Sequence, residues 1–242
     1  MMKCRYCSYA CVKAGKRKTK KQTYRCKSCR KYQQQDYGNA AHCLDTNSNI
    51  IKLLVEGIGI RGIARVLRIS MTTVIDRIKH IARSITKSYT YVKNGIYEID
   101  ELWTFIGNKG NETWIAYSFE RRSKKVIDFR VGARTKENLQ KVTESVLLLS
   151  PEKVCTDGLN TYKRLIPETL HRIGLPNTRH IERYNLNLRT HLKRLSRKTI
   201  CFSKSKEMLE ACLKIYFWSD RLSLQKHEPK SNLHYNTALR QG

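Results

Sequence analysis

The sequence predicts a multidomain α+β protein in three folded parts: an N-terminal zinc ribbon, a helix-turn-helix and a mixed α/β domain. Three observations predict this organisation. Two C-x-x-C pairs lie in a basic, cysteine-rich N-terminal segment, apolar residues then recur at helical spacing, and strand-like stretches lead into a helix and a further strand. We expect the parts to span residues 1–45, 46–90 and 96–218, followed by a polar tail at 219–242.

The charge balance points to a polyanionic partner. The chain has 242 residues, with 48 Lys+Arg against 20 Asp+Glu and a formal net charge of +28. Such a charge repels itself in a compact fold, so nucleic acid is favoured as the partner over an anionic membrane surface. No apolar run reaches about 18 residues, which argues against a membrane-spanning helix. No signal-peptide pattern opens the sequence, so we expect a cytoplasmic protein with reduced cysteines.

The first part contains two C-x-x-C pairs, which are candidate metal ligands. Cys4 and Cys7 form one C-x-x-C pair, and Cys26 and Cys29 form the other, with 18 residues between the pairs. Four thiolates at this spacing are typical ligands of a tetrahedral Zn²⁺. The segment has few large aliphatic residues, so zinc would supply the folding energy that its core lacks. The alternative is four reduced surface thiols.

A basic loop lies between the two C-x-x-C pairs. Its cations are Lys16, Arg17, Lys18, Lys20 and Lys21. A zinc-ordered loop of this charge is expected to bind DNA phosphates. The alternative is a charge run that only faces solvent.

The second part reads as three helices. Gly57 and Gly59 separate the first from the second, and Ser70 is placed to cap the third. The stretch from residue 60 to 83 therefore has the length and turn of a helix-turn-helix. Thr72, Thr73 and Arg77 near the start of its second helix are expected to contact DNA. A plain helical hairpin has a similar pattern and stays the alternative.

The sequence pattern of the third part predicts a mixed sheet. Three strand-like stretches are followed by a helical stretch, a short apolar strand and two further helical stretches. They lie at 96–107, 113–120, 124–133, 136–149, 153–156, 182–198 and 204–218. Strands, then a helix, then a strand are typical of a mixed α/β sheet.

Three carboxylates in this part are candidate metal ligands. Asp100 lies within the first strand, Asp157 ends a later strand, and Glu182 opens a helix. Side chains alternate along a strand, so Glu98 and Asp100 share one face and Glu101 takes the other. Converging oxygens of this kind suit two Mg²⁺ or Mn²⁺ ions. Alternatively, Asp157 pairs with a basic side chain or forms a turn, and Glu182 is an ordinary first-turn residue.

Several motifs together resemble the insertion-sequence-one (IS-one) family of bacterial and archaeal transposases. They are the two C-x-x-C pairs, the helix-turn-helix, IDELWTFIG, CTDG and IERYNLNLRTHLKRLSRKTICFSKS, and the resemblance extends from residue 4 to about residue 218. The stretch 182–205 is its most specific part. The resemblance implies a ribonuclease-H-like catalytic domain of the aspartate-aspartate-glutamate class.

Site residues follow from this resemblance position by position. The two aspartates fall on Asp100 and Asp157 and the glutamate on Glu182, with 24 residues between the last two. A basic residue seven positions after the glutamate is Arg189, which is expected to hold a DNA phosphate near the metals. Lys193 on the same stretch is a further expected DNA contact.

The resulting expectation is a DNA transposase in the bacterial or archaeal cytoplasm, associated with the nucleoid. It would bind the terminal inverted repeats of its element and transfer a cleaved strand to target DNA, with two Mg²⁺ or Mn²⁺ ions and a structural Zn²⁺. Synapsis of two ends implies a homo-oligomer, at least a dimer. The alternatives are a non-catalytic DNA-binding regulator and a metal-dependent nuclease of the same fold.

Overall fold

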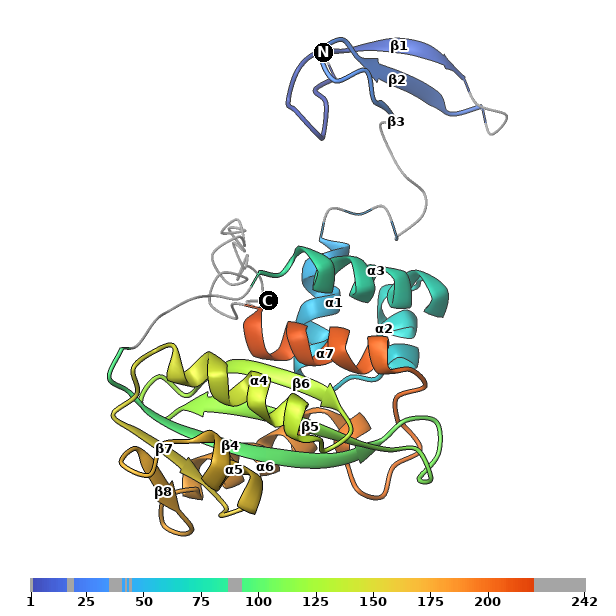
Figure 1. Ribbon diagram of the computed structural model, residues 1–242. Helices are drawn as coiled ribbons and strands as arrows, with labels where there is room; N and C mark the ends of the chain where they lie inside the picture. The colour runs from blue at the N-terminus through green and yellow to red at the C-terminus, as the bar shows by residue number, and fades with distance from the viewer. Residues whose placement is uncertain are drawn as a thin grey trace, which may run out of the picture.

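The computed structural model describes residues 2–16, 20–34, 41, 43, 45–86 and 93–219 (Figure 1). The predicted DNA contacts Arg17 and Lys18 and nearly all of the predicted tail lie outside these residues. Within the described part of the chain, no helix has both the length and the apolar character needed to cross a membrane.

The N-terminal part is a small antiparallel sheet, for which the sequence analysis gave no strand positions. Its strands are β1 (Cys11–Lys16), β2 (Gln22–Cys26) and β3 (Tyr32–Gln34), in that order. The buried hydrophobic side chains of its interior are those of Cys4, Cys11 and Cys26, and Thr23 and Gln33 are buried beside them as polar residues. So small a core cannot stabilise an independent sheet, which agrees with the expectation that a metal supplies the stability.

Three helices follow, as predicted: α1 (Thr46–Val55), α2 (Ile60–Leu67) and α3 (Met71–Ser84). Helix α2 ends at Leu67 and is followed by Arg68, whose φ of 53° is left-handed, and α3 begins three residues after Arg68, at Met71. The predicted cap is confirmed, because the Ser70 side chain accepts a hydrogen bond of 3.0 Å from the backbone N–H of Thr73. Capping of this kind fixes where α3 starts.

The third part contains a five-stranded mixed sheet in the order β6-β5-β4-β7-β8. The strands are β4 (Ile96–Phe105), β5 (Glu112–Glu120), β6 (Lys125–Gly132), β7 (Lys153–Thr156) and β8 (His171–Ile173). Neighbours among β4, β5 and β6 are antiparallel, whereas β7 and β8 continue the sheet in parallel to β4. The three-residue strand β8 was missed by the sequence reading because it is too short to show an alternation.

Helices cover both faces of this sheet. They are α4 (Lys136–Leu147), α5 (Asn160–Leu165), α6 (Arg179–His191) and α7 (Lys206–Trp218), with a 3₁₀ turn at Lys193–Leu195. Tyr97 and Ile99 of β4 pack in one core with α4 and α5, and Leu102 faces the core that contains α6 and α7. The odd and even positions of β4 therefore point to opposite layers, as the alternation predicted.

Helix α7 lies between the sheet and helices α1–α3 (Figure 1). One hydrophobic core joins Ile50 and Ile78 of the three helices to Leu209 of α7 and Ile115 of the sheet. Gly57 approaches the end of α6 so closely that a Cβ atom there would lie 2.4 Å from the carbonyl oxygen of His191. The three helices are thus packed directly onto the sheet domain.

Candidate active site and cysteine cluster

Two aspartates meet where β7 ends beside β4. Glu98 of β4 pairs with Cys155 of β7, so the parallel register continues to place Asp157 level with Asp100. Carboxylate oxygens of Asp100, Glu101 and Asp157 all lie within 4.8 Å of one another. We call these three residues the acid group. The sequence predicted two of its members, and the sheet brings them together.

Asp157 lies at the exposed side of the acid group. Its side chain is 46% exposed, and its Oδ1 accepts a hydrogen bond of 3.1 Å from the backbone N–H of Leu159. The nearest Arg134 nitrogen lies 3.9 Å from Oδ2. Gly158 has a φ of +92°, and a Cβ there would lie 2.7 Å from a methyl group of Ile173. Both local alternatives for Asp157, a turn and a basic neighbour, are therefore present around the carboxylate.

Glu101 is the member of the acid group that the sequence reading left out. It lies on the opposite face of β4 from Asp100, as predicted, but its carboxylate still reaches the group. Arg134 donates to its Oε2 at 2.6 Å, and the buried hydroxyl of Tyr162 donates to its Oε1. Its position next to Asp100 was the only signal in the sequence, since Arg134 and Tyr162 are distant in the chain.

Asp100 is largely buried, and its pKa is strongly shifted. Burial raises the pKa of Asp100 to about 7, with the charges of Glu101 and Asp157 acting in the same direction. Asn185 of α6 opposes this shift, because its Nδ2 donates to Asp100 Oδ2 at 2.6 Å. The hydroxyl of Tyr117 in turn donates to Asn185 Oδ1 at 2.8 Å. Asn185 is thereby held in one orientation between the strand and the helix.

A second carboxylate on this face anchors the start of α6. Glu98 is fully buried and accepts three hydrogen bonds, from Arg121 Nε at 2.8 Å, His180 Nδ1 at 2.9 Å and the backbone N–H of Ile181 at 2.7 Å. Arg121 also donates to the backbone carbonyl of Asn177 at 2.7 Å. The network ties the helix that carries Asn185 to strand β4.

Replacing Glu98 by alanine should destabilise the sheet domain by about 3–5 kcal/mol, because the cations of the network lose their buried partner. The measurement is urea unfolding followed by tryptophan fluorescence, since Trp103, Trp114 and Trp218 all lie in this domain. The exposed Glu168→Ala is the control and should change stability by less than about 0.5 kcal/mol. Equal stability of the two variants would contradict this role of Glu98.

The other predicted catalytic residues lie on α6 but outside the acid group. Glu182 is exposed, and its Oε1 accepts a hydrogen bond of 2.8 Å from Thr178 Oγ1. Arg189 is half-buried and donates to the backbone carbonyls of Leu195 at 2.6 Å and Trp103 at 3.3 Å. In this conformation Arg189 binds the chain itself, and burial lowers its pKa.

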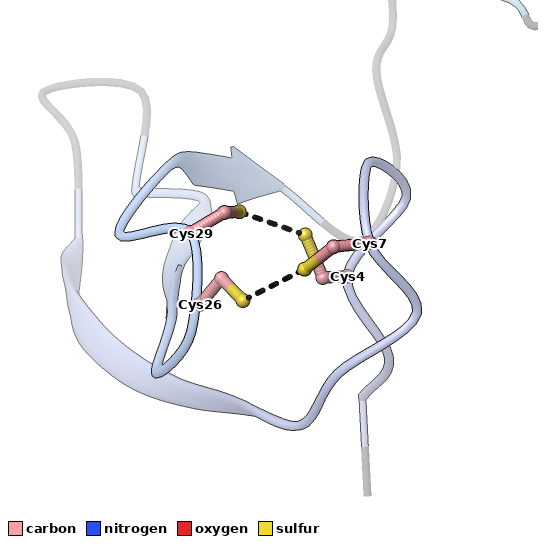
Figure 2. Close-up of side chains that lie close together, drawn as sticks. All are labelled: Cys4, Cys7, Cys26 and Cys29. Carbon is pink, nitrogen blue, oxygen red and sulfur yellow. Dashed lines mark hydrogen bonds between the residues drawn. The ribbon is translucent and has the colours of Figure 1, made fainter.

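The four predicted zinc ligands form a cluster (Figure 2). The sulfurs of Cys4 and Cys29 lie 3.5 Å apart and those of Cys7 and Cys26 lie 3.4 Å apart. Two thiolates on one tetrahedral zinc are about 3.8 Å apart, so this donor set fits such an ion. Burial acts to raise the pKa of Cys26, but hydrogen bonds from the Cys29 backbone and the Cys7 side chain lower it to about 6.

The predicted DNA contacts in the described part of the chain have different surroundings. Five of these residues are exposed, namely Lys16, Lys20, Lys21, Thr72 and Lys193. Thr73 takes part in the cap of α3. The guanidinium of Arg77 donates to Asn47 Oδ1 at 3.2 Å and to the backbone carbonyl of Ala41 at 2.9 Å. Arg77 must leave these partners before it can bind a base edge.

Comparisons with known proteins place the sheet domain in a family. The model of the IS1 transposase family matches residues 95–221, more than half of the chain. The Insertion element iso-IS1n protein InsB of Shigella dysenteriae is 40% identical over 118 residues, which are 48% of this chain and 88% of that protein. The Insertion element IS1 4 protein InsB of Escherichia coli K12 is 42% identical over 114 residues, 46% of this chain and 66% of that protein.

Among solved structures, the chain is similar to one in the cryo-electron microscopy structure of a simian T-cell lymphotropic virus intasome in complex with PP2A regulatory subunit B56 gamma. The likeness covers 76% of each chain at 14% identity and a TM-score of 0.37. The sequence matches are sufficient by themselves. The chain belongs to the IS1 transposase family.

Proposed function

We propose that this protein is a DNA transposase that cleaves and joins DNA strands with the acid group as its catalytic centre. The observation that carries the proposal is the meeting of Asp100 and Asp157 at the end of β7, within the part of the chain that matches the family. The proposal of a ribonuclease-H-like domain is supported by the mixed sheet, in which three antiparallel strands are extended by two parallel ones. An aspartate at the carboxyl end of a parallel strand also lies where α/β sheets place their ligands.

The acid group suits divalent metal ions. All its donors are carboxylate oxygens, which Mg²⁺ and Mn²⁺ prefer, and Asp100 and Asp157 lie at the more open side. Two such ions activate an attacking oxygen and stabilise the leaving oxygen of a phosphodiester. Water would be the first attacking group, which frees a 3′-hydroxyl, and that hydroxyl would then attack target DNA. The residues hold their carboxylates in place throughout and form no covalent bond to DNA.

Glu182 is proposed to join the two aspartates when metal and DNA bind. It precedes Asn185 by three positions on α6, and residues at this spacing are neighbours on a helix surface. Asn185 already touches Asp100, so Glu182 starts about one turn from the site. Among the described residues, its side chain has one hydrogen-bond partner, the Thr178 hydroxyl, and Glu182 itself is exposed. Release of that single hydrogen bond frees the carboxylate to turn toward the acid group.

Asn185→Ala should weaken metal binding about 10- to 100-fold, because groups that orient a metal ligand contribute about that much. Titration of Mn²⁺ followed by electron paramagnetic resonance measures this directly, without an activity assay. Asn187→Ala is the matched control, since Asn187 lies two positions further along α6 and lines a pocket elsewhere. An unchanged Mn²⁺ affinity in Asn185→Ala would show that the hydrogen bond to Asp100 does not prepare the site.

The parts before residue 95 are proposed to bind DNA. The exposed lysines Lys16, Lys20 and Lys21 lie at the end of the β1–β2 hairpin away from Cys11 and Cys26 and would contact phosphates. Zn²⁺ would hold the cysteine cluster together, and α3 would contact bases of the terminal inverted repeats through its first turn. Helices α1–α3 share a core with the sheet, so DNA on α3 would sit at a set position relative to the acid group. Work on two element ends requires at least two copies of the chain, in the cytoplasm where the DNA lies.

The direct test is a pair of assays on a DNA fragment that carries candidate inverted repeats. Mobility shift measures binding, and a gel measures Mg²⁺-dependent cleavage and strand transfer. A transposase binds the repeats and produces joined strands. A nuclease of the same fold would cleave without joining, and a regulator would bind without cleaving, so either of these results would overturn the proposal.

A further inference from the structure

A basic pocket lies beside α6 and is here called the α6 pocket. Its volume is about 510 Å³. Phe119 of β5 and Lys124 of the following turn form one side, and α6 supplies the rest, namely Arg179, His180, Arg183, Tyr184 and Asn187. No residue in the predicted DNA-binding set is among them.

The α6 pocket and the acid group lie on opposite sides of α6. His180, Arg183 and Asn187 line the pocket, whereas Glu182, Asn185 and Arg189 are the predicted or observed neighbours of the acid group. Each residue of the second set lies two positions after one of the first, which is about 200° around a helix axis. The pocket is therefore a separate site and not an extension of the proposed catalytic centre.

The positive charge of the pocket favours an anionic ligand. Lys124, Arg179 and Arg183 are all exposed, and among the described residues none of the three forms an ion pair. No acidic side chain lines the pocket, and Nδ1 of its His180 donates a hydrogen bond to the buried Glu98. Like charges gathered without a counter-ion repel one another, and a phosphate group relieves that repulsion.

An aromatic ring lies beside these cations. Tyr184 is partly exposed, and its ring is held against that of the buried Phe119 with 4.9 Å between the centroids. The pocket volume lies within the range of about 300–1,000 Å³ that is typical of small-molecule sites. A ring next to phosphate-binding cations is the arrangement by which proteins hold single nucleic-acid strands.

We propose that the α6 pocket binds one unpaired nucleotide of a DNA strand, with its phosphate at Arg179, Arg183 and Lys124 and its base on the Tyr184 ring. The base must be unpaired because the faces of bases within a duplex are covered by their neighbours. Asn187 can donate to and accept from the edge of the base. This inference rests on the proposed function and adds a strand-holding site on the far side of α6.

The test measures binding of a single-stranded oligonucleotide and of the same sequence as a duplex, by fluorescence anisotropy at several salt concentrations. Arg179→Glu/Arg183→Glu removes the phosphate contacts, and Lys109→Glu/Lys141→Glu makes the same charge change at exposed lysines on the β4–β5 turn and α4. Tyr184→Leu removes the ring, and Tyr184→Phe keeps it. Tryptophan fluorescence confirms that each variant is folded.

Tyr184→Leu should weaken single-strand binding about 5- to 100-fold while Tyr184→Phe binds normally. The arginine pair should lower the slope of log affinity against log salt by about 1.4, and the lysine pair should not. Single-strand binding that Tyr184→Leu leaves intact, or an arginine pair that behaves as the lysine pair does, would overturn the inference. If the inference fails in this way, cleavage of repeat DNA by the wild-type protein would still support the proposed function.

Discussion

Asp157→Asn should abolish metal-dependent cleavage and strand transfer while leaving DNA binding nearly intact. Asp157 is the exposed aspartate of the acid group and lies level with Asp100 on the neighbouring strand. An amide oxygen carries no negative charge to offset that of a divalent ion, so the proposed metals lose an anionic ligand. Even groups that only orient a ligand are worth about 10- to 100-fold, so we expect a loss of more than about 100-fold.

The fold should survive this substitution. The oxygen of an asparagine side chain can still accept the hydrogen bond from the backbone N–H of Leu159, which keeps the turn after β7. Glu152→Gln, five residues earlier and exposed, is the matched control and should retain activity. Full strand transfer by Asp157→Asn would exclude the acid group as the catalytic centre, and lost DNA binding in a folded variant would show that Asp157 has a structural role.

Removal of zinc should unfold the N-terminal sheet and leave the rest of the protein folded. Structural zinc contributes about 10–16 kcal/mol to small domains at neutral pH. Here the interior consists mainly of Cys4, Cys11 and Cys26, so little else opposes unfolding. The three helices and the sheet domain contain two hydrophobic cores that are separate from this interior. Limited proteolysis after chelation should therefore cut within residues 2–34, while tryptophan fluorescence, which comes only from the sheet domain, stays unchanged.

Two cysteine variants test whether the zinc is bound by the cysteine cluster. Cys26→Ser should lose bound zinc, measured as one equivalent per chain in the wild type by atomic absorption, and should bind DNA more weakly. Cys201→Ser is the control, because Cys201 is exposed and lies outside the cluster. A Cys26→Ser protein with full zinc content would show that the cluster is not a structural metal site.

Local patterns account for the elements that the sequence predicted. The three helices before the sheet, strands β4 to β7 and helices α4, α6 and α7 follow from periods of 3.6 and 2, and the Ser70 cap follows from residue type. Strand β8 and helix α5 were missed because three and six residues are too few to show a period. The positions of the strands in the cysteine-rich part were not predicted, because their stability does not depend on an apolar face.

The candidate site also contains some features that the sequence predicted and others that only the tertiary structure decided. The spacing of the C-x-x-C pairs predicted the cysteine cluster. The strand patterns placed Asp100 within β4 and Asp157 after the end of β7, because these positions depend on chain-local geometry. Strand order, the entry of Glu101 into the acid group with Arg134 and Tyr162, and the attachment of Arg189 to backbone carbonyls depend on contacts between residues far apart in the chain. A sequence period records which side of an element is buried, but only packing in three dimensions decides which partner buries it.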